Sequence, residues 1–147
     1  MNEREGRPAS MTIAPDVLDA VADHARTSAP LECCGLLVGT ADRIDECVPT
    51  GNVDPSPARF QVDPGEHIRL NRRLRGSGRE VVGVYHSHPR GPAAPSATDV
   101  AEAAYPEFVH LIVSLADAVR PEVRAFRIEN GVVTSVTLAS ETVRARS

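Results

Sequence analysis

The sequence contains no lysine and no tryptophan, and it has only two tyrosines and three phenylalanines. A chain without lysine cannot form a Schiff base through a side-chain amine, which excludes that route of covalent catalysis. The shortage of aromatic rings argues against stacking on single-stranded nucleic acid. The formal net charge is −4, so a broad phosphate-binding surface is not expected either. Nucleic acid is therefore not an expected partner.

Cysteine and long apolar runs are also scarce. Cys33, Cys34 and Cys47 are too few for a disulfide framework, and we interpret them as buried thiols in a reducing compartment. No apolar run approaches the roughly 18 residues of a membrane span. Residues 1–10 lack the apolar segment of a signal peptide. These features predict a cytoplasmic protein without a membrane partner.

The 147 residues and the hydrophobic share of 41% suit one domain with a single core. We place this domain at residues 11–140 and expect flexible tails at 1–10 and 141–147. Helices are predicted from Asp16, from Pro64 with Asp63 as the cap, and from a Ser96 cap. Apolar runs and alternation predict strands at 11–13 (an edge strand), 35–39, 43–48, 60–62, 81–85, 108–115, 123–129 and 132–138. The fold class is therefore α/β or α+β, with a mixed, curved β-sheet flanked by helices.

Two histidines stand directly after the buried strand predicted at 81–85. In extended backbone, His86 and His88 point to the same side, and a helix beginning near Ser96 returns Asp99 towards them. Two imidazole nitrogens and one carboxylate form a three-ligand catalytic zinc site with a fourth position for water. Magnesium and calcium prefer oxygen ligands, so this set favours one Zn²⁺ per chain. The ordinary alternative is an incidental histidine pair beside a helix cap in which Asp99 opposes the helix dipole.

A zinc hydrolase also needs a proton acceptor beside the attacking water. Glu32 precedes a predicted core strand and is the candidate general acid and base, although a surface glutamate is the simpler interpretation of this residue alone. Ser96 is the candidate donor to the developing oxyanion. The remaining histidines, His24, His67 and His110, are given ordinary structural roles.

Taken together, these residues resemble the JAMM motif of MPN-domain metallopeptidases. That motif has an acid far upstream, a His-Ser/Thr-His element, a seven-residue gap, a serine, two further residues and an aspartate. Here Glu32 is the acid, His86 and His88 are the histidine pair, seven residues follow, and Ser96 precedes Asp99 by two intervening positions. All five chemical positions of the motif are present.

The resemblance covers residues 12–138 and implies an MPN architecture close to that of cytidine deaminases. It implies zinc on His86, His88 and Asp99, with Glu32 as acid and base and Ser96 stabilising the oxyanion. The implied reaction is hydrolysis of the peptide or isopeptide bond after the Gly-Gly tail of a ubiquitin-like or sulfur-carrier protein.

Alternatives to that reaction remain open. One branch of the family releases cysteine from a sulfur-carrier adduct, and some members are scaffolds that have lost zinc ligands. Only residues 100–107 separate the aspartate from the next predicted strand, so the second ubiquitin-gripping insertion of eukaryotic members is minimal here. Base deamination is excluded because the His-x-Glu and Cys-x-x-Cys pattern is absent. The oligomeric state, and whether the loop at 51–59 covers the site, are not indicated by the sequence.

Overall fold

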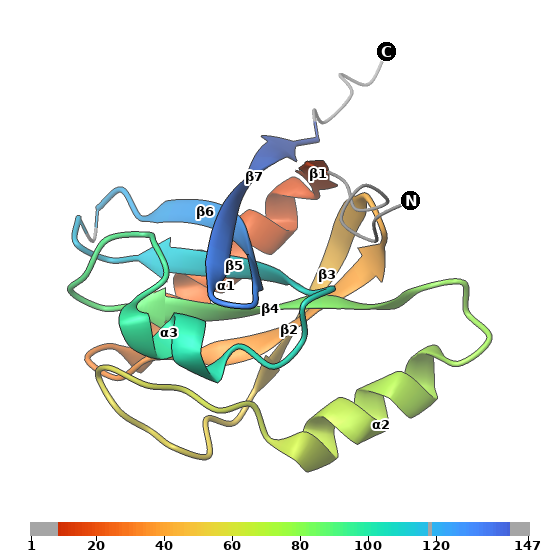
Figure 1. Ribbon diagram of the computed structural model, residues 1–147, viewed down its shortest axis with the longest axis horizontal. Coiled ribbons are helices and arrows are strands. Elements are labelled where there is room, and N and C mark those ends of the chain that lie inside the picture. The colour runs from red at the N-terminus through yellow and green to blue at the C-terminus, as the bar shows by residue number, and fades with distance from the viewer. Residues whose placement is uncertain (1–8, 118, 142–147) are drawn as a thin grey trace.

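Seven strands and three helices form from residues 9–117 and 119–141, the part of the chain that the computed structural model describes. In chain order they are β1 (Ser10–Ile13), α1 (Pro15–Ser28), β2 (Cys34–Thr40), β3 (Arg43–Thr50), α2 (Pro64–Leu74), β4 (Glu80–His88), α3 (Ala97–Glu102), β5 (Val109–Ser114), β6 (Glu122–Glu129) and β7 (Val132–Ser140). Figure 1 shows their arrangement. The mixture of parallel and antiparallel pairs confirms the α+β class.

The helix starts follow the local chemistry that the sequence predicted. Pro15 stands at the beginning of α1, where its missing N–H has no partner to lose. Asp63 caps α2 because its side chain accepts a hydrogen bond from the Gly65 N–H at 2.8 Å, and Pro64 follows at the first helical position. Both helix predictions are confirmed.

The strands close into a barrel in the order β1-β3-β2-β4-β5-β6-β7, so the expected curved sheet is wrong in this respect. Closure depends on β1, which pairs in parallel with β3 on one side and with β7 on the other. The segment predicted as an edge strand at 11–13 therefore has two neighbours. The local residue pattern of a four-residue strand does not indicate which distant strands will pair with it. For this reason the pattern predicts only an edge strand.

Two shorter predictions had different outcomes. Asn130 and Gly131 have φ values of 52° and 78°, the conformation of a two-residue turn between β6 and β7, so the hairpin is confirmed. The strand expected at 60–62 is wrong, because that segment contributes only an isolated bridge between Asn52 and Val62. It belongs instead to a loop that crosses the face of the sheet between β3 and α2 (Figure 1).

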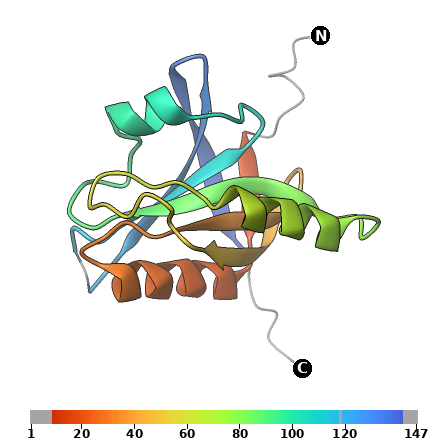
Figure 2. The same cartoon turned by 90° about the horizontal axis from the view of Figure 1, so that it is seen from below.

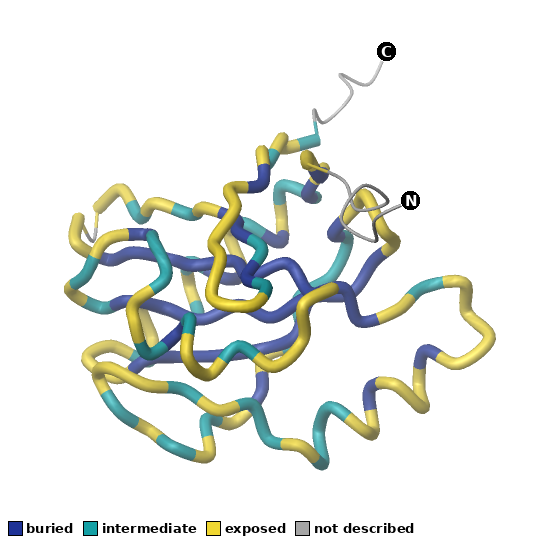
Figure 3. The backbone as a smooth tube through the Cα atoms, in the orientation of Figure 1, coloured by how far each residue is buried: buried dark blue, intermediate teal, exposed yellow. Residues whose placement is uncertain are grey.

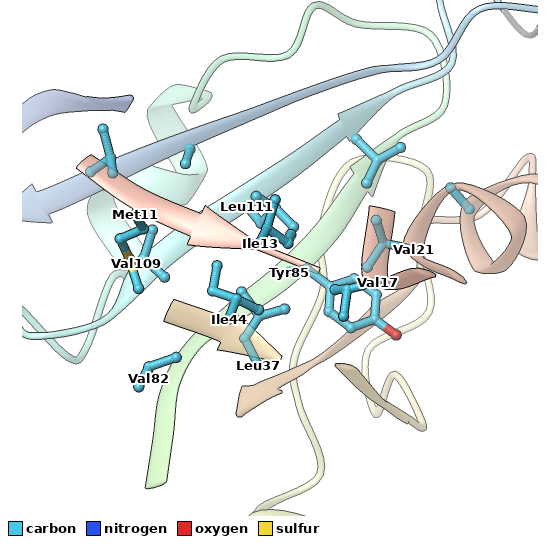
Figure 4. Close-up of a cluster of buried hydrophobic side chains, with 14 of the residues drawn as sticks. Met11, Ile13, Val17, Val21, Leu37, Ile44, Val82, Tyr85, Val109 and Leu111 are labelled. Atoms are coloured by element: carbon cyan, nitrogen blue, oxygen red, sulfur yellow. The ribbon is translucent and has the colours of Figure 1, made fainter. Parts of the chain in front are cut away.

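Helices cover the strands from several sides. In Figures 1 and 2, α1 and α3 lie on opposite sides of the strands, and α2 lies along the outside of β2 and β4. The buried residues follow the middle strands (Figure 3). One core cluster joins α1 to the barrel interior, where Val17 and Val21 approach Tyr85 (Figure 4). A second cluster joins Leu70 and Leu74 of α2 to the outer face of the sheet.

The register between β2 and β4 depends on a glycine. Gly35 is paired with Tyr85, and a Cβ at Gly35 would lie 2.3 Å from the tyrosine ring. The absent side chain lets the ring cross β2, and its hydroxyl forms a 2.7 Å hydrogen bond with His24 Nδ1. Burial of a large side chain of this kind stabilises a fold by about 1.5–3 kcal/mol. The next residue of β4, His86, is thereby held in register with Cys34.

The tails expected at 1–10 and 141–147 lie largely outside the described residues, which omit 1–8 and 142–147. At their inner ends, Ser10 begins β1 and the Glu141 carboxylate pairs with Arg43. Among the described helices, none has the length and apolar character that crossing a membrane would require.

Candidate metal centre

Both histidines of the motif lie on β4, which extends three residues beyond its predicted end at 85. His86 and His88 are consequently two residues apart in extended backbone, and their ring centroids are 5.0 Å apart on one face of the sheet. His86 is paired with Cys34 of β2 and with Ile112 of β5, so it occupies a central strand. It is fully buried, and His88 is 8% exposed.

Glu32 reaches this face because the segment before β2 is joined to β4. The Cys33 N–H donates to the Ser87 hydroxyl at 2.9 Å, and the Ser87 N–H donates to the Cys33 carbonyl at 3.2 Å. The carboxylate of Glu32 is 4% exposed, and its Oε1 atom lies 3.3 Å from His86 Nδ1. The pairing of β2 with β4 thus places the predicted acid, Glu32, against the predicted metal ligand His86.

Asp99 reaches the same point from the first turn of α3. Ser96 and Asp99 form a reciprocal cap: the Ser96 hydroxyl accepts from the Asp99 N–H at 3.0 Å, and Asp99 Oδ2 accepts from the Ser96 N–H at 2.9 Å. The same Oδ2 atom lies 3.0 Å from His88 Nε2 and 3.6 Å from His86 Nε2. The cap therefore holds a carboxylate between two imidazoles.

Several buried polar atoms in this cluster have no hydrogen-bond partner. They are Glu32 Oε1 and both ring nitrogens of His86. Leaving such an atom buried and unpaired costs about 1–3 kcal/mol. Glu32, His86 and His88 each offer a ligand atom, and these three atoms lie within 4.8 Å of one another. A cation bound by one ring nitrogen of His86 would satisfy that atom, while the other ring nitrogen would still need a proton or an acceptor as its partner. The nitrogen and oxygen donors of this group fit zinc, although Asp99, the third ligand expected from the sequence, is not one of its three residues.

The hydrogen bonds of His88 also indicate a site for a cation. Its Nδ1 atom lies 2.8 Å from the Pro92 carbonyl, and because a carbonyl only accepts, Nδ1 carries a proton. Nε2 then faces Asp99 across 3.0 Å and requires either a second proton or a cation there. Burial would lower the pKa of His88, but the hydrogen bonds to Asp99 and Pro92 outweigh it and raise the pKa.

Asp99 carries the negative charge of this pair. Burial opposes ionisation of its carboxyl group, but the hydrogen bond with His88 and the charge of His86 outweigh burial and lower the pKa of Asp99 to about 2. Asp99 therefore remains a carboxylate throughout the neutral range, which is the form that binds a metal.

The loop between β3 and α2 packs directly on the centre. The Phe60 ring stacks on His86 with the centroids 4.1 Å apart and the planes at 15°. The Glu32 N–H donates to the Ser56 carbonyl at 2.8 Å, and the Asn52 side chain donates to the Glu32 carbonyl at 3.1 Å. The sequence does not predict a role for Phe60, Ser56 or Asn52, because their spacing from the histidines matches no motif.

Two cavities open beside the centre. One, of about 560 Å³, is lined by Asp99, Phe60, Tyr105 and Phe108 among others, and we call it the Asp99 cavity. The other, of about 570 Å³, is lined by Glu32 among others, and we call it the Glu32 cavity. Both volumes are typical of sites for small ligands or extended peptide segments.

The remaining histidines and cysteines do not join the cluster of ligand atoms within 4.8 Å. His110 lies on β5 and lines the Asp99 cavity, and burial together with the charge of His86 lowers its pKa to about 4. Cys33 and Cys34 are buried free thiols, and burial raises the pKa of Cys33 to about 11. These thiols stay protonated. The interpretation of the cysteines as buried thiols is therefore confirmed for Cys33 and Cys34, whereas Cys47 is only partly buried.

Comparison with known proteins adds independent information. The family model described as prokaryotic homologs of the JAB domain matches residues 14–129. The CysO-cysteine peptidase of Mycobacterium tuberculosis is 36% identical over 133 residues, covering 89% of this chain and 91% of the relative. The desampylase of Haloferax volcanii is 36% identical over 111 residues, covering 71% of this chain and 80% of the relative.

A solved structure is also similar throughout its length. The solution structure of a Desulfitobacterium hafniense protein has a TM-score of 0.81 and 33% identity, and the match covers 89% of this chain and 92% of that one.

Proposed function

Because this chain belongs to the family of prokaryotic homologues of the JAB domain, as its motif predicted, we propose that it is a zinc-dependent peptidase acting on ubiquitin-like or sulfur-carrier proteins. The observation that carries the proposal is the convergence of two imidazoles with the carboxylates of Glu32 and Asp99, at a place where buried polar atoms have no hydrogen-bond partner. The relatives named CysO-cysteine peptidase and desampylase support a peptidase in this family.

The residues divide into ligands and groups that handle protons. We assign His86, His88 and Asp99 as the ligands of one zinc ion. Bound there, zinc would supply a Lewis acid that polarises the substrate carbonyl and acidifies water. Glu32 takes a proton from the attacking water on its carboxylate and later gives it to the departing nitrogen. The Ser96 hydroxyl accepts from Asp99 and keeps its own proton, which it donates to the oxyanion.

The substrate is an extended carboxyl-terminal tail that ends in Gly-Gly. A tail without bulky side chains fits the cavities beside the buried histidines, which residues 54, 57, 58 and 59 help to line, whereas a folded domain does not. The acyl side of the scissile bond lies on the side of the Asp99 cavity, whose apolar and aromatic wall suits an extended segment.

Release of cysteine from a sulfur-carrier adduct is the second candidate reaction. This reaction uses the same centre and differs only in the leaving group, which is a free cysteine rather than a lysine side chain. It is favoured by the match to the mycobacterial CysO-cysteine peptidase, which extends over 91% of that relative. A carrier adduct and a lysine isopeptide presented to the same enzyme distinguish the two reactions.

Metal removal tests the proposal. A chelator is expected to abolish cleavage of a fusion joined through a Gly-Gly tail, and added Zn²⁺ to restore it. His88→Gln should lose zinc, while the matched control His24→Gln, on α1 and outside the centre, should retain it. Full activity in the chelated protein would refute the metal assignment.

Replacement of the proton carrier gives a second test. Glu32→Gln keeps the size of the side chain, so we expect zinc to remain and turnover to fall by about 10²–10⁴-fold. Loss of zinc in this variant would instead make Glu32 a ligand. A protein with full zinc, bound carrier and no cleavage of any tail would show a scaffold rather than an enzyme.

A further inference from the structure

The two cavities beside the metal centre differ in which catalytic group they expose. Glu32, His88 and Ser96 line the Glu32 cavity, whereas Asp99 lines the other one and Glu32 does not. Under the proposed function, Glu32 is the group that must protonate the departing nitrogen. The leaving group therefore lies on the side of the Glu32 cavity.

The wall of the Glu32 cavity is rigid and poor in charge. Prolines and alanines provide most of it, at positions 30, 57, 58, 89, 92, 94 and 95. Arg90 is the one arginine among its lining residues, all of which belong to the described chain, and it follows the ligand His88 by two positions. Arg90 is exposed, and its planar guanidinium offers a fork of donors that matches the two oxygens of a carboxylate.

Arg90 is also available for a ligand. In the described part of the chain it forms no ion pair with a protein carboxylate. Arg59, which lines the Asp99 cavity, is by contrast already paired with Asp54 and Glu102. The Glu32 cavity thus holds an uncommitted cation beside the group that protonates the leaving nitrogen.

We propose that Arg90 binds the α-carboxylate of a single amino acid as it leaves, so that this enzyme prefers a carrier extended by one residue to a lysine isopeptide. The inference rests on the proposed function. In an amino acid the carboxylate carbon is two bonds from the scissile nitrogen, within the span of one cavity. In an isopeptide that nitrogen is followed by four methylene groups, and no carboxylate comes near it.

The bond changes are those of amide hydrolysis. The oxygen of water joins the carbonyl carbon of the terminal glycine, and the bond from that carbon to nitrogen breaks. The nitrogen takes the proton held by Glu32 and departs as the amine of the free amino acid. Arg90 keeps its charge throughout and contributes by holding the carboxylate, so it is a specificity residue.

Two substrates isolate this contact. A Gly-Gly-ending carrier from the same organism is extended by one cysteine with a free carboxylate, or by cysteinamide, which lacks the charge. Wild-type enzyme should favour the acid over the amide by about 10-fold to 100-fold in kcat/KM, as expected for a charge-assisted hydrogen bond. Arg90→Gln should remove this preference through KM, and Arg90→Lys should restore part of it.

The control variant is Arg75→Gln, an exposed arginine at the end of α2 that lines neither cavity; it should keep the preference. Equal use of acid and amide by the wild type, or an equal loss on both in Arg90→Gln, overturns the role of Arg90 while the proposed peptidase stands. If the zinc-loaded wild type cleaves neither extended carrier nor an isopeptide-linked one, the proposed function fails, and this inference fails with it.

Discussion

Ser87, the residue between the two histidines of the candidate metal centre, should contribute to both stability and turnover. Its side chain is fully buried and accepts the Cys33 N–H at 2.9 Å. Ser87→Ala leaves that N–H buried without a partner, at a cost of about 1–3 kcal/mol. For a domain of this size the melting temperature should fall by about 2–12 °C. Because Glu32 precedes Cys33 in the chain, its carboxylate loses part of its restraint, and under the proposed function kcat should fall as well.

Urea unfolding and steady-state kinetics on the zinc-loaded protein measure the two effects. Ser87→Thr keeps the hydroxyl and should retain most of both properties. Tyr85→Phe is the matched control, since it removes a buried hydroxyl from the neighbouring position of β4 but leaves Cys33 untouched. It should lose stability and keep kcat. If Ser87→Ala lowers stability but leaves kcat equal to that of Tyr85→Phe, the link from Ser87 to Glu32 is refuted.

Two further predictions concern rings that sequence analysis did not connect with the centre. Phe60→Ala removes the ring stacked on His86, a contact worth about 0.5–1.5 kcal/mol. We therefore expect the melting temperature to fall by about 1–6 °C and the variant to lose zinc more readily to a competing chelator. Unchanged zinc retention would show that the ring does not cover the centre. Burial lowers the pKa of His110 from about 6.5 in the unfolded chain to about 4 in the folded protein. Its contribution to stability is therefore fully present above pH 6.5, declines by at most about 3 kcal/mol as pH falls to 4, and does not change further below pH 4. His110→Gln should flatten the decline in urea unfolding curves, and an unaltered slope would contradict the buried, neutral state.

Features encoded by neighbouring residues were predictable from the sequence. The caps at Asp63 and Ser96 and the turn at 130–131 depend on contacts within three residues, so their chemistry is visible in the chain. The histidine pair was found for the same reason, because the spacing of two already places both rings on one face of a strand. The motif then related these residues to Glu32, which no local rule could have done.

Features that depend on distant partners were missed. Polar residues at 86–88 look like the end of a strand, yet β4 continues through them because β2 and β5 supply hydrogen bonds on both sides. Barrel closure requires β1 to meet β7, which begins more than a hundred residues later. The stacking of Phe60 on His86 depends on the path of a loop with little regular structure. Each of these is fixed by tertiary pairing rather than by propensity.

Helix capping and metal binding are competing explanations of Asp99 in the sequence, but the geometry lets one side chain serve both roles. A carboxylate has lone pairs enough to accept the Ser96 N–H and still face an imidazole nitrogen. The cap restricts the side chain to the rotamer that points at His86 and His88, so less conformational entropy is lost when a cation is bound. In return, α3 has six residues and is too short to be stable alone, so contacts with the centre help to hold it. Under the proposed function, substitution of Asp99 therefore disturbs both α3 and the metal ligands, whereas substitution of Glu32 changes proton transfer and leaves the helix intact.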